Sequence, residues 1–328
     1  MARVVRVHEL GGPEQLVFEE MEVGAPGPGE VRLRIEAVGL NRSEAMFRAG
    51  RYPTKPQLPT LIGYEACGIV EALGEGVTGF DIGQRVSALP MYPLGQYGVW
   101  AEQAIVPARC LLPAPEGLSP AEAAAVWMQY MTAFAIIEVG AAGIGDFVII
   151  PAASSSVGLA AIQLANWAGA VSIAATRTSA KAAQLKALGA AHVIATEQVD
   201  LVADVMRISE GKGARIVFDP VQGPYVQTLT SAMAVGGILF IYGGLSEQPT
   251  PYPHWNMAFK GLSMRGWVAS EIWNHPHRYK AAQERILLGL KLGRLKPVIA
   301  KTFPFAQMVE ANRFLESNQQ IGKVVVTM

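Results

Sequence analysis

A buried strand that runs through a turn of small residues into a helix carries the clearest chemistry in this sequence. The segment reads FVIIPAASSSVGLAAIQLA, from Phe147 to Ala165. Such a turn points free backbone N–H groups and the positive end of a helix at one place, which suits a pyrophosphate. Small residues also occur in other tight turns, so the turn by itself is a weak signal. The alternation of strands and helices that follows it supports its interpretation as a nucleotide site. The G-x-G-x-x-G spacing falls on the first, third and last of the expected phosphate contacts, which are Ala153, Ser154, Ser155, Ser156, Val157 and Gly158.

The end of the next strand indicates which dinucleotide would bind. An NAD site usually places a carboxylate there, about 20 residues after the turn, to bind the ribose 2′-hydroxyl. This sequence has Thr176, Arg177 and Thr178 instead, with Lys181 in the following turn. Two cations and two hydroxyls would attract a 2′-phosphate, so we expect NADPH as the cofactor. The alternative is that both cations are ordinary solvated charges.

The elements around this turn predict an α/β protein of two domains, in agreement with a length of 328 residues. Residues 1–120 consist of short apolar runs between glycines and prolines, typical of an all-β barrel or sandwich. Over 121–264, buried β-branched runs alternate with helical segments, which predicts a parallel sheet covered on both faces. The tail, 265–328, contains an amphipathic helix near 275–293 and a final strand, KVVVT. The residues alone leave open which domain the tail joins.

Composition excludes several other classes of protein. The formal net charge is zero and no run of like charges reaches five residues, unlike a nucleic-acid binder or a basic membrane-surface helix. No apolar stretch is long enough to span a membrane, and the N-terminus lacks the pattern of a secretory signal. Two cysteines, Cys67 and Cys110, cannot form a disulfide framework or a four-cysteine zinc site. We therefore expect a reduced, cytoplasmic protein without nucleic-acid or membrane partners.

Taken in order, these motifs resemble the medium-chain dehydrogenase/reductase superfamily, and within it the zinc-independent quinone oxidoreductases of the ζ-crystallin-like branch. The resemblance covers nearly the whole chain and includes HELGGPEQLVFEE, GPGEVRLRIEAVGLN, GVTGFDIGQRV, AASSSVG, FDPVQG and IGKVVV. It implies a GroES-like catalytic β-barrel formed by 1–120 and completed by 265–328, with a doubly wound Rossmann domain over 121–264. It also implies a homodimer that pairs through the Rossmann sheets, near ILFIY and LSMRGWV.

The resemblance allows the metal question to be examined position by position. Zinc-dependent relatives have a cysteine where this sequence has Asn41, a histidine where it has Tyr64, and a third ligand at Met128. Zn²⁺ binds thiolate, imidazole and carboxylate groups, so all three positions lack a good ligand. His275 and His277 are the only close histidine pair, and the proline between them favours a turn over a metal site. We therefore expect no metal.

Without a metal, the charge that develops on the acceptor needs a hydrogen-bond donor from the protein. The resemblance places Asn41 and Tyr52 in the cleft beside the nicotinamide, where an amide and a phenol are suitable donors. Tyr64 replaces the ligand histidine and is expected in the same cleft. Each of the three has an alternative role in a turn or in packing. The remaining cofactor contacts implied by the resemblance are Thr132, Gly243, Gly244 and Lys323.

The expected activity is hydride transfer from NADPH to a small electrophile, a quinone or a similar conjugated carbonyl. Reduction of an activated alkene such as an enone remains open, as does reduction of an aldehyde by a metal-free alcohol dehydrogenase. A different class of function is a non-catalytic, crystallin-like NADPH-binding protein, because fold does not fix function. A flat apolar pocket lined by aromatic residues such as Trp267 is a further hypothesis.

Overall fold

The computed structural model describes residues 1–328 and divides into two compact units. Unit 1 comprises residues 1–128 and 297–328, and unit 2 comprises residues 129–296. The chain therefore returns to unit 1 at Pro297 and not at the expected position 265. The reason lies in strand β14 (Ser263–Gly266), which pairs with the sheet of unit 2 and keeps the following helices there. No helix is both long and apolar enough to cross a bilayer.

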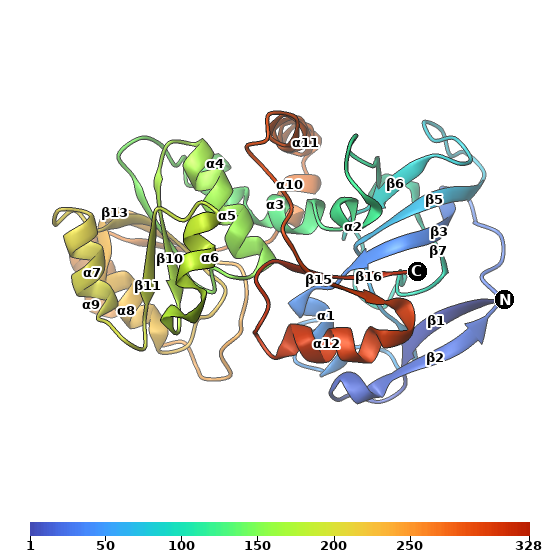
Figure 1. The fold of residues 1–328 in the computed structure, drawn as a ribbon, viewed down its shortest axis with the longest axis horizontal. Helices are drawn as coiled ribbons and strands as arrows, with labels where there is room; N and C mark the ends of the chain where they lie inside the picture. The colour runs from blue at the N-terminus through green and yellow to red at the C-terminus, as the bar shows by residue number, and fades with distance from the viewer. The chain divides into compact units, whose positions relative to one another are not determined.

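Unit 1 is built from two sheets, with strand orders β2-β1-β4 and β15-β16-β3-β5-β6-β8, and β7 pairs with β3 (Figure 1). The last strand of the chain, β16, lies between β15 and β3, so the C-terminal tail completes this sheet. Helix α3 begins at the end of unit 1. The elements are β1 (Ala2–Val7), β2 (Leu16–Met21), β3 (Glu30–Gly39), α1 (Arg42–Arg48), β4 (Thr60–Leu61), β5 (Ala66–Leu73), β6 (Arg85–Ala88), β7 (Gln103–Pro107), β8 (Leu111–Pro113), α2 (Pro120–Ala123), α3 (Trp127–Ala133), β15 (Ile299–Pro304), α12 (Met308–Glu316) and β16 (Lys323–Thr327).

The alternation of residue types in β3 explains its place at the centre of this sheet. Val31, Leu33 and Ile35 are fully buried, while the alternate residues Arg32, Arg34 and Glu36 are more exposed. Successive side chains of a strand point to opposite faces, so a period of two places one apolar row in the core. Beyond Ala37 both faces are buried, and the strand leads directly into the polar residues that precede α1.

Unit 2 contains a six-stranded, all-parallel sheet of order β11-β10-β9-β12-β13-β14, flanked by helices (Figure 1). Numbered within the unit, this is the order 3-2-1-4-5-6 of a dinucleotide-binding Rossmann sheet, which confirms the predicted fold class. The remaining elements are α4 (Ala135–Glu138), β9 (Phe147–Ile150), α5 (Ser156–Trp167), β10 (Val171–Thr176), α6 (Ala182–Ala187), β11 (His192–Ala195), α7 (Leu201–Ile208), β12 (Ala214–Asp219), α8 (Tyr225–Ser231), β13 (Met233–Ile241), α9 (His254–Lys260), α10 (Ser270–Trp273) and α11 (Pro276–Lys291).

The sheet order fixes where a ligand can bind in unit 2. The order reverses between β9 and β12, and ligands of such sheets bind at the carboxyl ends of the strands beside this reversal. The small-residue turn follows β9 directly, so it lies at this edge. The order also restricts how a dimer could form near ILFIY and LSMRGWV. Strand β13 is paired on both sides, so an edge-to-edge contact in this region would have to use β14.

Candidate functional site

The turn after β9 has the geometry of a phosphate-binding turn. Ser155 caps helix α5, and its Oγ accepts a hydrogen bond from the Gly158 N–H at 3.0 Å. The N–H groups of Ser156 and Val157 have no acceptor in the protein, as expected for the first turn of a helix. Ala153 is buried, whereas the residues from Ser154 to Val157 are half-buried. The turn therefore presents free N–H donors and a helix N-terminus to an anion.

Gly158 is required for the close approach of helix and turn. A Cβ at this position would lie 2.7 Å from the carbonyl oxygen of Ala153 and 2.8 Å from that of Ala152. Neither neighbour can yield easily, because both are backbone atoms. The third glycine position of the fingerprint is thus retained for a steric reason, while the first two tolerate the small residues found there.

The expected 2′-phosphate residues lie at the end of β10. Thr176 ends this strand, and Arg177 and Thr178 are exposed. The ammonium of Lys181 donates a hydrogen bond to the Ser154 hydroxyl at 3.0 Å, which joins the cationic residues to the phosphate turn. Burial, and secondly the charge of Arg177, lowers the pKa of Lys181. A bound phosphate would replace this repulsion with attraction, so the residues fit NADPH.

Several residues at this edge were not predicted from the sequence. Asp219 ends β12 and accepts the N–H groups of Val221 and Gln222, at 2.8 and 3.0 Å. The Gln222 amide donates to the carbonyl oxygen of Gly243, which ties the loop after β12 to the loop after β13. The Tyr242 hydroxyl lies beside Ser155. A polar residue directly after a buried strand was the available signal, in FDPVQG and ILFIYGG.

The other predicted contacts in unit 2 differ in how tightly they are constrained. A Cβ on Gly243 would lie 3.1 Å from atoms of Pro220, whereas Gly244 has almost open space. Thr132 is buried, and its carbonyl oxygen accepts the indole N–H of Trp267 at 2.8 Å. Trp267 is itself only 2% exposed. It is a core residue whose indole N–H anchors the Thr132 segment.

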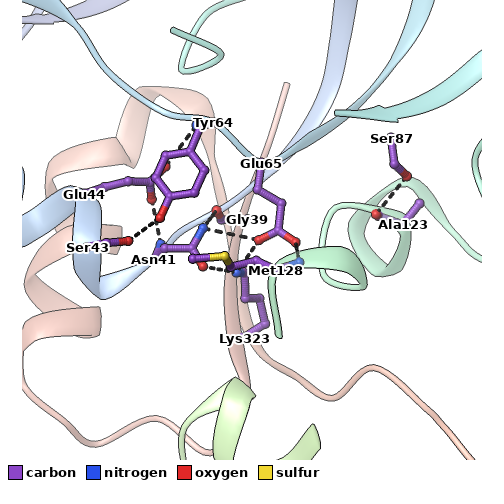
Figure 2. Close-up of polar contacts among 10 residues, drawn as sticks. All are labelled: Gly39, Asn41, Ser43, Glu44, Tyr64, Glu65, Ser87, Ala123, Met128 and Lys323. Atoms are coloured by element: carbon purple, nitrogen blue, oxygen red, sulfur yellow. Dashed lines mark hydrogen bonds and ion pairs between the residues drawn. The ribbon is translucent and has the colours of Figure 1, made fainter. Parts of the chain in front are cut away.

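Unit 1 contains a buried polar cluster that joins residues far apart in sequence (Figure 2). The ammonium of Lys323, the first residue of β16, donates to Glu65 Oε2 at 2.5 Å and to Asn41 Oδ1 at 2.6 Å. Asn41 Nδ2 donates to the Gly39 carbonyl oxygen at 3.0 Å and to Glu65 Oε2 at 3.2 Å. The other oxygen of Glu65 accepts the Met128 N–H at 2.9 Å. The cluster therefore connects β3, β5, α3 and β16.

Two sequence-based roles change in this arrangement. Lys323 is 1% exposed and bonded to Glu65 and Asn41, so its ammonium is not placed to bind a phosphate. Both hydrogens of the Asn41 amide are used within the protein, which leaves none to donate to an acceptor.

Tyr64 and Ser43 form a hydroxyl pair beside this cluster (Figure 2). Tyr64 is 4% exposed, and its hydroxyl hydrogen-bonds to that of the half-buried Ser43. Burial raises the pKa of Tyr64 well above its usual value, so the phenol remains protonated. Tyr52 is half-buried against the same core and lies within electrostatic range of Tyr64. Of these hydroxyls, those of Ser43 and Tyr64 are in direct contact.

The donor set at the three former metal positions is an amide, a phenol and a thioether, from Asn41, Tyr64 and Met128. None of these groups is a usual ligand of Zn²⁺. No group of three or more histidine, cysteine, aspartate or glutamate side chains in residues 1–328 is arranged to hold a metal ion.

Glu44 gives the cluster a pH dependence. It is fully buried, and burial raises the pKa of its carboxyl group to about 8, although the N–H groups of Asn41 and Tyr64 donate to it. From about pH 4.5 upward the unfolded chain releases this proton while the folded chain keeps it. The free energy of unfolding should therefore fall as pH rises towards 8, by at most about 1.4 kcal/mol per pH unit, and then level off.

Urea unfolding of the wild type and of Glu44→Gln at several values between pH 4.5 and 8 measures this contribution. The difference between the two proteins should narrow or reverse with rising pH, because glutamine does not titrate. A difference that is constant over this range would show that Glu44 keeps an ordinary pKa in the fold.

Comparisons with known proteins agree with this geometry. Residues 27–116 match the alcohol dehydrogenase GroES-like domain family, and residues 156–287 match the zinc-binding dehydrogenase family. A 2-haloacrylate reductase of Burkholderia sp is 31% identical over 338 residues, covering 99% of each chain. The crystal structure of Escherichia coli quinone oxidoreductase complexed with NADPH superimposes with a TM-score of 0.91 at 25% identity, over 100% of both chains. A structure of an NAD-dependent alcohol dehydrogenase gives 0.90 at 32% identity, over 99% of both.

Proposed function

Because the chain belongs to the medium-chain dehydrogenase/reductase superfamily, in its quinone oxidoreductase branch, we propose that it reduces a quinone or a similar conjugated carbonyl without zinc. The protein is an oxidoreductase that acts on a small molecule with NADPH as cofactor. The observation that supports zinc-free reduction of a quinone is the buried polar cluster of unit 1. Its amide, phenol and thioether stand at the positions of metal ligands, beside an ammonium already paired with Glu65.

In this proposal, one set of residues binds NADPH and another stabilises the negative charge on the acceptor oxygen. NADPH supplies the hydride when bound, and the turn from Ala153 to Gly158 binds its pyrophosphate. Arg177 and Lys181 bind the 2′-phosphate. A quinone that takes up one hydride becomes the hydroquinone monoanion, and one proton then gives the neutral hydroquinone. The protein must therefore stabilise negative charge on oxygen until that proton is added. The hydroxyls of Ser43, Tyr64 and Tyr52 provide that hydrogen bonding.

Reduction of an activated alkene is the second candidate. It is supported by the relative named 2-haloacrylate reductase, which is 31% identical over nearly the whole chain. In that reaction the hydride adds to the β-carbon, negative charge develops on the activating oxygen, and a proton adds to the α-carbon. The same hydroxyl groups would stabilise that oxygen, so the choice between the two depends on measured rates.

The experiment compares three acceptors with the purified protein and NADPH: 1,4-benzoquinone, an enone and an aldehyde. Loss of NADPH absorbance should be fastest with the quinone and unchanged after treatment with a strong chelator. Faster turnover of the enone would favour alkene reduction, and loss of activity with the chelator would return a metal to the mechanism. No turnover of any acceptor would refute the proposal.

We also propose that the protein is a homodimer formed through the open edge of β14. Val268, just beyond this strand, is 59% exposed and would be covered in such an interface. Light scattering on the same preparation should give twice the chain mass of 35.0 kDa. A monomer mass would reject the dimer without affecting the proposed activity.

A further inference from the structure

The neighbours of the Asn41 amide permit only one orientation of that group (Figure 2). An ammonium can only donate hydrogen bonds, whereas a carboxylate and a carbonyl oxygen can only accept them. Lys323 therefore has to face Oδ1, while Glu65 and the Gly39 carbonyl have to face Nδ2. The orientation follows from the chemistry of the partners and does not depend on distinguishing nitrogen from oxygen by position.

This orientation determines what Asn41 can offer to a ligand. The two amide hydrogens are both used, and Oδ1 has two lone pairs, of which Lys323 takes one. The only capacity left is one lone pair on Oδ1. Asn41 can thus accept a hydrogen bond from a ligand but cannot donate one.

The charges that hold this orientation are deeply buried. The side chains of Lys323 and Glu65 are each 1% exposed, and their charged atoms are 2.5 Å apart. A buried charge without its partner is strongly destabilising, so each of these groups stabilises the other in its place. Glu65 is held further by the Met128 N–H. Flipping the amide would place Nδ2 against the ammonium and Oδ1 against the carboxylate, which both partners oppose.

We propose that Lys323 and Glu65 are positioning residues that lock Asn41 as a hydrogen-bond acceptor in the reduction site. This inference rests on the proposed function. Because 1,4-benzoquinone has no N–H or O–H group, the donor that Asn41 recognises belongs to the nicotinamide end of NADPH, where alignment affects hydride transfer more than affinity. The oxygen of the electron acceptor is left to the hydroxyls of Ser43, Tyr64 and Tyr52. The lysine and the glutamate do not contact the substrate in this role.

The test removes the interactions by which Glu65 and Lys323 fix the orientation of Asn41, which we call the lock, with side chains of similar shape. Glu65→Gln can donate as well as accept, so it no longer dictates the orientation of Asn41. Because this change leaves the ammonium of Lys323 without an anion, the neutral double variant Glu65→Gln/Lys323→Met is made as well. Glu316→Gln is the matched control, since Glu316 also accepts from a buried cation of unit 1, Arg48.

In the two lock variants we expect kcat with 1,4-benzoquinone to fall about 10- to 100-fold, while the Kd for NADPH stays within about twofold. The control should keep kcat within about twofold. In an Asn41→Ala background, the same lock substitutions should lower kcat by no more than about twofold further. Wild-type kcat in the neutral double variant, or an undiminished effect in the Asn41→Ala background, would overturn the proposal.

The lock can also be measured without any turnover. Hydrogen exchange of the Asn41 side-chain amide, assigned by its loss in Asn41→Ala, should be slow in the wild type and faster in Glu65→Gln. Fast exchange in the wild type would overturn the lock. If the wild type reduces none of the acceptors, the proposed function fails, and slow exchange would still support a locked amide.

Discussion

Replacing Arg177 and Lys181 together with alanine is expected to raise the Kd for NADPH about 100- to 1,000-fold and to leave that for NADH within about threefold. Hydrogen bonds to charged groups contribute about 1.5–3 kcal/mol each, and two such cations would be lost. The Lys181 ammonium already lies on the phosphate turn through Ser154, and Arg177 is close enough to lower its pKa. NADH lacks the 2′-phosphate, so its binding does not depend on either charge.

Fluorescence titration with both nucleotides measures the effect, and Lys186→Ala serves as the matched control. Lys186 lies on α6, a few residues from Lys181, and is exposed. Its removal lowers the local positive charge by the same amount at a position that no phosphate contact requires. An equal loss of NADPH affinity in the control would mean that general charge, and not a phosphate site, attracts the nucleotide. Equal weakening of NADH would mean that the pair acts elsewhere on the cofactor.

The Rossmann unit was predictable because its signals are local. A buried strand, a small-residue turn and a helix follow one another from Phe147 to Trp167, and each can be identified from its own residues. The repetition of this alternation then predicts a parallel sheet without knowledge of distant contacts. The cationic end of β10 was predictable for the same reason, since Arg177 and Lys181 lie close together in sequence.

The interior of unit 1 was less predictable because its partners are distant in sequence. Lys323 is 258 residues from Glu65 and 282 residues from Asn41. No periodicity or spacing relates such positions, so the sequence predicted Lys323 as a cofactor contact and Asn41 as a hydrogen-bond donor to the acceptor. Only the pairing of β16 with β3 brings the lysine to the end of β3, where it meets both partners.

The boundary after β14 illustrates a different limit. The segment Ser263–Gly266 is short, and its side chains are exposed or half-buried, so it carries little pattern of its own. It joins the sheet of unit 2 because β13 offers a parallel edge, from Ile238 to Ile241. Composition alone does not show which sheet such a strand joins, because the available sheet edge decides it. The domain boundary predicted at 265 therefore differs from the observed return to unit 1 at Pro297.

Replacing Tyr64, whose hydroxyl pairs with that of Ser43, by phenylalanine is expected to lower kcat strongly. Removing one donor from a site that stabilises charge on oxygen lowers kcat about 100-fold in comparable enzymes, and we expect this magnitude with 1,4-benzoquinone. Ser43→Ala should lower kcat less, about 10-fold, because the phenol remains. The Kd for NADPH should not change in either variant, since the phosphate contacts lie in unit 2.

Tyr92→Phe is the matched control for this prediction. Tyr92 is buried in the same apolar core, and its hydroxyl donates only a long hydrogen bond of 3.4 Å to the Gly63 carbonyl oxygen. If loss of kcat in Tyr64→Phe reflected packing alone, Tyr92→Phe would show a similar loss. If Tyr64→Phe keeps its kcat while Tyr52→Phe loses it, Tyr52 is the donor and Tyr64 is a packing residue. Because burial keeps the pKa of Tyr64 high, the phenol remains a donor throughout the neutral range, and its effect on kcat should not depend on pH there.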